Sequence, residues 1–152
     1  AEAISQLLSL SSIICKVDTI EPIPIDRIKL PYVISLYGSP GSKSVEAICL
    51  MDLYAACMLG GAMTSMPAAQ IKNAIASKTL NKEMYENCSS FLRDMSGIIS
   101  ASREKPLTFT SSHLVQKPFA KLYELMGNNY GRTDFGVSFS AYGDGFITIL
   151  LS

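Results

Sequence analysis

The sequence has one histidine, His113, and no two cysteines close enough together to form a metal-binding motif. Its four cysteines are Cys15, Cys49, Cys57 and Cys88, whereas protein zinc sites are built from ligand pairs a few residues apart. We therefore expect no metal and no other cofactor. Four buried free thiols are expected instead, as is typical of a reducing compartment, although four cysteines would also suffice for two disulfides.

Charged residues are scarce. They make up 17% of the chain, against about 25% in an average globular protein, and 13 basic residues balance 13 acidic ones. The densest basic group, Lys117, Lys121 and Arg132, is interrupted by Glu124 and Asp134. Binding of nucleic acid through its phosphates needs concentrated lysine and arginine, so we expect no nucleic-acid partner. Low charge favours contact with a protein partner or a second copy of the chain, and a large core would give the same composition.

The chain also lacks a long uninterrupted apolar run and a recognisable leader. Its most apolar stretch, residues 45–63, contains Glu46 and Asp52, and a membrane span needs about 20 apolar residues. No basic segment precedes an apolar one at the start, as a secretory leader would require. We expect a cytoplasmic protein with no membrane insertion. A length of 152 residues is typical of a single domain, here 1–152.

Familiar catalytic and ligand-binding motifs are missing as well. Residues 38–44 (GSPGSKS) contain glycines and Lys43 but lack the spacing of a phosphate-binding loop, so they predict a hairpin turn. The acidic residues do not follow the spacing of a calcium loop. His113 has no nucleophile motif nearby, so we expect a structural or exposed histidine there.

Apolar periodicity and turn residues predict a mixture of strands and helices. The predicted strands lie at 32–37, 45–51, 107–115, 135–142 and 146–152. The predicted helices lie at 53–63, 67–77, 82–100 and 118–127, and residues 4–14 suggest a short helix that runs into a strand. Residues 18–31 contain three prolines and predict a loop or an edge segment. The first two and the last two strands flank short turns, which predicts two hairpins. Together these elements predict an α+β domain, with a mainly antiparallel sheet and helices packed on one face.

The helix after Asp52 is apolar nearly all round. Asp52 is a suitable cap for its first turn. Such a helix is either deeply buried or lies at an interface. Gly60 and Gly61 each cost about 1 kcal/mol in a helix interior, so they predict a helix end or a very close backbone contact.

The helix at 82–100 is amphipathic, with Asn81 as its predicted cap. Its apolar residues recur at spacings of three and four, which is the helical period. Its other face is polar, and it is either an ordinary solvent-exposed face or a recognition face. The residues that we expect to bind a partner there are Glu83, Glu86, Asn87, Ser89, Ser90, Arg93 and Ser96.

From residue 32 to the end, this layout resembles the CheC/CheX family of bacterial chemotaxis phosphatases. The resemblance lies in a hairpin followed by D-L-x-x-A (52–56), a small-residue helix, a long helix, a strand, a helix and a closing hairpin. Residues 1–31 are covered poorly. The resemblance implies a CheX-like fold, a role in chemotaxis signalling, and a response-regulator receiver as the protein partner.

In that family the long helix carries an E-x-x-N motif. The glutamate anchors a phosphorylated receiver, and the asparagine positions water for in-line attack on the aspartyl phosphate. In the family, an aspartate or serine precedes the glutamate by four residues, and a proline follows at a distance. A register with Ser89 and Pro118 at these two flanking positions puts Arg93 in place of the glutamate and Ser96 in place of the asparagine. No register keeps both motif residues, because the register on Glu83 places Glu86 at the asparagine position, and the register on Glu86 places Ser90 and Arg93 at the two motif positions. The resemblance therefore implies a relative that binds a partner without catalysis.

Other functions stay open at this point. An active phosphatase would have to use Glu83 and Glu86 as its catalytic residues. A homodimer or larger oligomer would pair through the apolar helix Leu53–Met63 and the edge of the C-terminal hairpin. A small-molecule sensor is a further alternative, although no convergent polar cluster indicates a ligand. We expect the partner-binding function.

Overall fold

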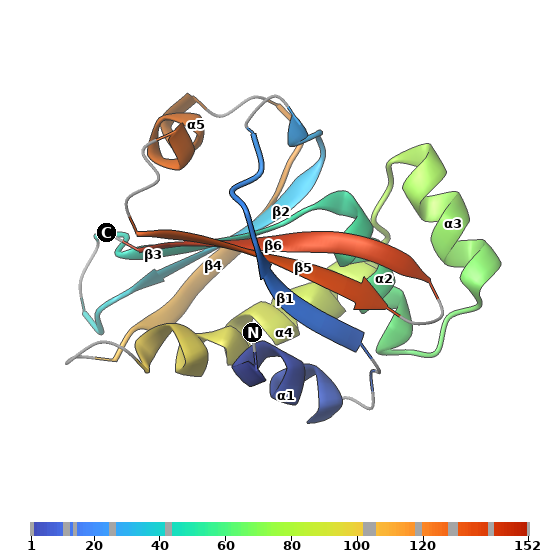
Figure 1. Ribbon diagram of the computed structural model, residues 1–152, viewed down its shortest axis with the longest axis horizontal. Helices are drawn as coiled ribbons and strands as arrows, with labels where there is room; N and C mark the ends of the chain where they lie inside the picture. Colours follow the sequence, from blue (N-terminus) through green and yellow to red (C-terminus); the bar gives the residue numbers. More distant parts are fainter. Residues whose placement is uncertain are drawn as a thin grey trace.

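The computed structural model describes residues 2–10, 13, 15–24, 27–41, 44–101, 106–117, 120–127, 131–139 and 142–151. In chain order its elements are α1 (Glu2–Leu10), β1 (Cys15–Ile20), β2 (Tyr32–Gly38), β3 (Ala47–Met51), α2 (Leu53–Ala62), α3 (Ala68–Ser77), α4 (Lys82–Ser100), β4 (Thr108–Val115), α5 (Ala120–Gly127), β5 (Arg132–Phe139) and β6 (Gly143–Leu151) (Figure 1). Lys43 and Pro118, to which the sequence assigned a turn and a motif position, lie outside the described residues.

The six strands form one sheet in the order β1-β5-β6-β3-β2-β4, and every neighbouring pair is antiparallel. This confirms the predicted α+β class and both predicted hairpins, β2–β3 and β5–β6. The sheet edges are β1 and β4. The C-terminal hairpin lies inside the sheet, because β1 pairs with β5 and β3 pairs with β6. The prediction that this hairpin offers a free edge to a second copy is therefore wrong.

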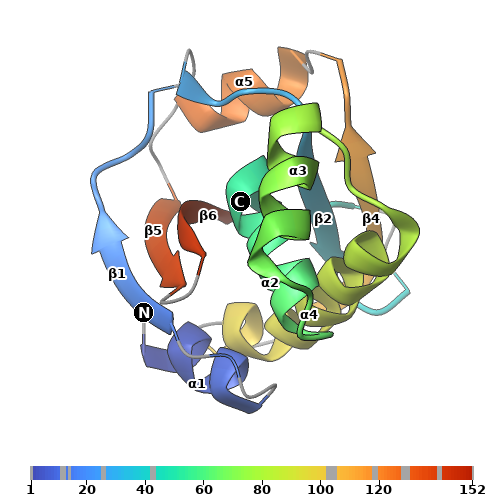
Figure 2. The ribbon, with the colours of Figure 1, turned by 90° about the vertical axis from the view of Figure 1, so that its right-hand side faces the viewer.

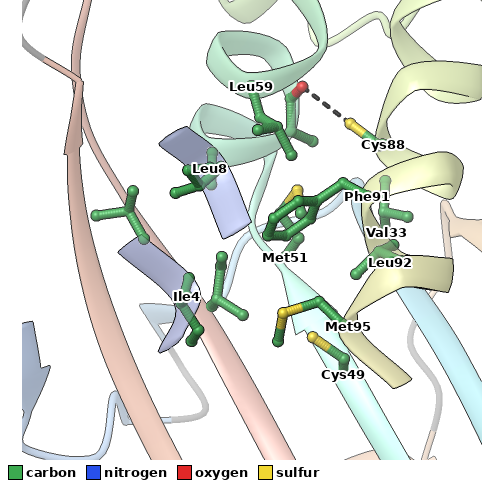
Figure 3. Close-up of a cluster of buried hydrophobic side chains, with 14 of the residues drawn as sticks. Ile4, Leu8, Val33, Cys49, Met51, Leu59, Cys88, Phe91, Leu92 and Met95 are labelled. Carbon is green, nitrogen blue, oxygen red and sulfur yellow. Dashed lines mark hydrogen bonds between the residues drawn. The ribbon is translucent and has the colours of Figure 1, made fainter. Parts of the chain in front are cut away.

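Helices α1, α2 and α4 cover one face of the sheet and enclose the main core (Figures 1 and 2). Alternate residues of β2 and β3 point to this face, as the period of a strand requires. The side chains that meet in the centre include Ile4, Leu8, Val33, Cys49, Met51, Leu59, Phe91, Leu92 and Met95 (Figure 3). For α1, α2 and α4, this layer matches the prediction that helices pack on one face of the sheet. Within the layer, α4 lies on the outside of the domain (Figures 1 and 2).

Helix α5 lies on the opposite face of the sheet (Figure 2). Leu122 of α5 joins a second buried cluster, made of residues from the other set of alternating strand positions. The cluster is Ile28, Tyr32, Ile34, Ile48, Leu50, Leu122 and Leu150. Both faces of the sheet thus carry apolar cover, although the larger core lies beneath α1, α2 and α4.

A buried ion pair holds the proline-rich segment against the sheet. Arg132 Nε donates to Asp134 Oδ1 over 2.8 Å, and both side chains are almost completely buried. The same two residues bind the main chain of Ile23, whose N–H donates to Asp134 Oδ2 and whose carbonyl accepts from the Arg132 guanidinium. Because these bonds also satisfy the main-chain groups of Ile23, the segment needs no strand partner at this point.

Helix α2 is buried inside the domain. Asp52 caps it by accepting a hydrogen bond from Ala55 N (2.8 Å), and the same Oδ1 accepts one from Phe146 N (3.0 Å). A Cβ on Gly60 would lie 2.7 Å from the Met84 carbonyl oxygen of α4, so the predicted close backbone contact is confirmed. Eight of the ten α2 residues are buried inside the domain, and Tyr54 is the large apolar side chain of α2 that is exposed. Because the apolar surface of α2 is already covered by the rest of the domain, the prediction that α2 pairs two copies is wrong.

The four cysteines are free thiols, which confirms the first of the two sequence-based alternatives. Cys49, Cys57 and Cys88 are buried, and Cys15 is half-buried. Burial raises the pKa of Cys49 to about 12, so this thiol stays protonated at neutral pH. Of the described helices, none is both long and apolar enough to cross a membrane.

Candidate partner-binding site on helix α4

Helix α4 begins where Asn81 Oδ1 accepts a hydrogen bond from Met84 N over 2.8 Å, as the sequence predicted. Its buried side chains recur at three- and four-residue spacings, and they are Met84, Cys88, Phe91, Leu92, Met95 and Ile99. Two further contacts fix the helix: Cys88 Sγ donates to the Ala56 carbonyl over 3.1 Å, and Asn87 binds α2 as described below (Figure 3). The rotation of α4 about its axis is therefore set by its packing.

The opposite side of α4 is a continuous exposed row, which we call the α4 ridge. Its residues are Glu83, Glu86, Ser90, Arg93, Asp94 and Gly97. Four of the predicted partner-binding residues are on it, namely Glu83, Glu86, Ser90 and Arg93. The Glu86 carboxylate lies 3.8 Å from Lys82 Nζ, and both side chains are largely exposed. A pair of this kind contributes little to stability, so both groups remain available to a partner.

Asn87 is not on the ridge. Its Nδ2 donates a 2.8 Å hydrogen bond to the Gly60 carbonyl of α2, and its side chain is half-buried. The amide thus joins two packed helices at the point where Gly60 allows them to approach. The sequence predicted Asn87 on the exposed polar face. A polar residue occurs both on an exposed face and at the half-buried border between two helices, so the sequence could not distinguish the two.

Ser89 and Ser96 lie on the side of α4 that faces strand β4, and both are half-buried. Ser89 Oγ is 3.0 Å from Ser112 Oγ, and Tyr85 Oη is 2.8 Å from the same Ser112 oxygen. Residues 85, 89 and 93 follow one another at four-residue spacing, so they form one row along the helix.

We call this row and the residues it meets the α4–β4 seam, made of Tyr85, Ser89, Arg93, Phe109 and Ser112. The sequence pattern indicated Ser89 and Arg93 but not Tyr85, Phe109 and Ser112. Of these three, Tyr85 could have been found from the sequence, because it lies four residues before Ser89 and therefore on the same side of the helix.

Arg93 lies over an aromatic ring. The centre of its guanidinium is 4.8 Å from the centroid of the Phe109 ring. Phe109 in turn meets the Tyr37 ring edge-on, with centroids 6.0 Å apart and an interplanar angle of 76°. The β2–β4 register shifts between Leu36 and Tyr37, so that Tyr37 is paired with Phe109 and not with Thr110. This bulge brings Phe109 to the face of the sheet that carries α4.

The ridge carries both acids that were predicted as catalytic candidates, but none of its residues has an amide side chain. Glu83 and Glu86 are both exposed, and the nearest amide donor along the helix, Asn87, is bound to Gly60. Among the described residues, no group of three or more histidine, cysteine, aspartate or glutamate side chains gathers to hold a metal ion. His113 is exposed, with Nε2 2.9 Å from Ser111 Oγ, outside the seam. The ridge is thus an exposed polar helix face, bordered by the half-buried hydroxyl groups of the seam.

Asp52 has a perturbed pKa but does not belong to the site. Burial raises the pKa of its carboxyl to about 6, although the hydrogen bonds that it accepts from the backbone N–H groups of Ala55 and Phe146 lower the pKa. A perturbed carboxylate can indicate an active site, but this one is enclosed between the first turn of α2 and strand β6. Its hydrogen bonds give it a structural role as the cap of α2.

No family model and no curated protein matches the sequence. Solved structures do match the fold. A FliM–SpeE complex from H. pylori has a TM-score of 0.61 at 9% identity, over 97% of this chain and 78% of that chain. CheX from Vibrio vulnificus has a TM-score of 0.56 at 17% identity, over 99% and 95%. The CheX–CheY–BeF3–Mg complex from Borrelia burgdorferi has a TM-score of 0.53 at 13% identity, over 99% and 93%. The chain therefore has the CheX/FliM-like fold, as the resemblance to the CheC/CheX family predicted.

Proposed function

We propose that this chain is a cytoplasmic, CheX-like signalling module that binds a protein partner, such as a response-regulator receiver, and does not dephosphorylate it. The observation that carries this proposal is the α4 ridge. A helix fixed on three sides by packing presents an uninterrupted polar row to solvent. A rigid helix face needs little ordering when it binds, so its contacts are not offset by lost conformational freedom.

The structural neighbours support the kind of partner. One of them is a complex between CheX and CheY, and another is a complex between FliM and SpeE. The fold therefore carries protein-binding sites in two different settings. Of the two neighbours, the CheX–CheY complex is the one that bears on a receiver, which is the partner that the sequence resemblance implies.

The side chains on the ridge favour binding without catalysis. In-line attack on an aspartyl phosphate needs a group that orients the water molecule. Glu83 and Glu86 offer two carboxylates one helical turn apart, and negative charges repel the phosphoryl group. The amide of Asn87, which could orient water, binds the Gly60 carbonyl instead. These contacts support binding without turnover.

The experiment combines binding and activity. A phosphorylated CheY-type receiver is titrated with the protein, and the rate of phosphate loss is followed in the same mixture. We expect saturable binding and an unchanged rate of phosphate loss. An accelerated rate that is lost in Glu83→Ala or Glu86→Ala would instead make this an active phosphatase. Glu124→Ala is the matched control, because Glu124 is an exposed acid on α5, on the opposite face of the sheet.

A homodimer remains a separate prediction. The surfaces that the sequence suggested for it are enclosed in the domain, so a dimer would have to use another surface. The edge strands β1 and β4 are the candidates in the sheet, since each has one strand neighbour. Measuring the solution mass over a range of protein concentrations tests the prediction, and a constant monomer mass would contradict it.

A further inference from the structure

Arg93 is an exposed cation whose hydrogen-bond donors are not used within the described part of the chain. It contacts Phe109 through the ring face, and no described residue accepts a hydrogen bond or forms an ion pair with it. Its helical neighbours three and four residues away are small and uncharged, namely Ser89, Ser90, Ser96 and Gly97. The guanidinium therefore lacks the carboxylate that usually accompanies an arginine at these spacings.

The contact with Phe109 leaves the donors free. A guanidinium that lies over an aromatic ring is held by its planar face, whereas its N–H groups point outward from the edge of the plane. Phe109 is itself held by Tyr37, whose hydroxyl is bound to α4. The arginine is thus partly ordered before any partner arrives, which reduces the entropy lost on binding.

The surroundings of Arg93 favour an anion. The α4–β4 seam beside it contributes the hydroxyl groups of Tyr85, Ser89 and Ser112 and no carboxylate. Asp94 is the nearest acid in sequence and also belongs to the α4 ridge, but it lies about 100° further round the helix and forms no ion pair with Arg93. The acids Glu83 and Glu86 lie about 10 to 15 Å away along the helix axis. The α4 ridge therefore carries two acids near its N-terminal end, and its single cation, Arg93, lies further along the helix beside Asp94.

We propose that Arg93 binds a surface carboxylate of the protein partner as a bidentate pair. This inference rests on the proposed function, and it adds the chemistry and the position of the partner surface. A carboxylate matches the two parallel N–H groups of a guanidinium better than it matches a lysine ammonium. A partner carboxylate that pairs with Arg93 must lie over the C-terminal half of α4, which fixes where on the ridge that surface of the partner docks.

The first test measures the affinity for a CheY-type receiver with substitutions at position 93. We expect Arg93→Ala to weaken binding about tenfold, Arg93→Lys to recover part of the loss, and Arg93→Glu to weaken it further. Lys72→Ala is the matched control, because Lys72 is an exposed cation on α3, and its affinity should equal that of the wild type. A receiver with lysine in place of the contacting acid should restore binding to Arg93→Glu. Equal affinities for Arg93→Ala and the wild type, or no restoration from any surface acid of the receiver, would contradict the proposal.

A second test is independent of the receiver. The arginine side-chain N–H signals are followed by NMR during titration with a capped peptide of alternating glutamate and serine, and then with its lysine–serine counterpart. We expect a saturable, salt-sensitive shift of the Arg93 signal with the acidic peptide alone. A wild type that fails to bind receivers but shows this shift would contradict the proposed function and support the anion site. Absence of the shift would overturn the anion site itself.

Discussion

The hydroxyl of Tyr37 donates a 2.6 Å hydrogen bond to the main-chain carbonyl of Leu92, so it joins strand β2 to the middle of helix α4. Ser35 Oγ completes the arrangement by donating to the Tyr37 oxygen over 2.8 Å. All three groups are buried. The same tyrosine ring supports Phe109, and Phe109 supports Arg93. The Tyr37 side chain thus has two roles. Its hydroxyl group helps to hold α4 in place, and its ring supports the Phe109 ring beneath Arg93.

Tyr37→Phe tests the contribution of this hydroxyl. The substitution keeps the ring and its contact with Phe109 but removes the bond to Leu92 and leaves Ser35 with a weaker partner. We expect the free energy of unfolding to fall by about 1 to 2 kcal/mol, measured by urea denaturation. Tyr85→Phe is the control, because it removes a tyrosine hydroxyl from the half-buried seam, where water can replace Ser112. A smaller loss for Tyr37→Phe than for Tyr85→Phe would contradict this account.

Two glycines on neighbouring helices should respond to alanine in opposite ways. In Gly60→Ala the new methyl group would meet backbone atoms of Met84 at 2.7 and 3.0 Å, and these atoms cannot move aside without shifting α4. We expect a loss of about 2 kcal/mol in the free energy of unfolding. In Gly97→Ala the methyl group meets nothing within 4 Å, and the higher helix propensity of alanine should stabilise the protein by about 0.5 to 1 kcal/mol. Changes of the same sign would be inconsistent with the close α2–α4 contact.

The raised pKa of Asp52 predicts that the stability of the protein depends on pH in a specific way. Burial raises the pKa of its carboxyl from 3.8 to about 6 in the folded protein, so the folded state binds this proton more tightly than the unfolded state. Its contribution to stability is therefore greatest at low pH and falls by about 3 kcal/mol as the pH rises from about 4 to about 6.

Asp52→Asn keeps an oxygen that can cap α2 but cannot ionise. The difference in unfolding free energy between the wild type and Asp52→Asn should decrease steadily across that pH range, with the wild type losing stability relative to the variant. Comparing the two proteins at each pH removes the contribution of the other acids, which titrate in both. A flat difference would show that the carboxyl of Asp52 is not perturbed.

Thr148 offers a case in which removing a polar group should help. Its side chain is fully buried in β6, and no described group forms a hydrogen bond with Oγ1. Valine has nearly the same shape and carries no hydroxyl group, so we expect Thr148→Val to stabilise the protein by about 1 kcal/mol in urea denaturation. Ser35→Ala is the contrasting variant, because its hydroxyl is bonded to Tyr37, and it should destabilise. Destabilisation by Thr148→Val would indicate that the hydroxyl has a partner.

Local patterns in the sequence predicted much of the fold. Asn81 was identified as the cap of α4, Asp52 as the cap of α2, and Gly60 as a candidate for a close contact, because each signal involves a few neighbouring residues. The order of the strands could not be predicted in the same way. The bonds from Arg132 and Asp134 to Ile23 join residues more than a hundred positions apart, and nothing near either end of the chain indicates them.

In the candidate site, too, local patterns predicted the helix but not its contacts with other elements. The helical period identified the polar face of α4 and brought Glu83, Glu86, Ser90 and Arg93 to one ridge. It could not show that Asn87 turns toward Gly60, since a boundary position is polar in either case. Phe109 was missed because its position beneath Arg93 depends on the bulge in β4, which has no signature in the surrounding residues.

The most direct test of the central claim blocks the α4 ridge and measures receiver binding. Ser90 is exposed in the middle of the ridge, and Ser90→Trp would place a bulky side chain there without disturbing the buried face of α4. Ala69→Trp is the control, on the exposed side of α3. The account predicts that Ser90→Trp abolishes binding of the phosphorylated receiver, while Ala69→Trp binds like the wild type. Undiminished binding by Ser90→Trp would contradict the claim that the partner docks on this ridge.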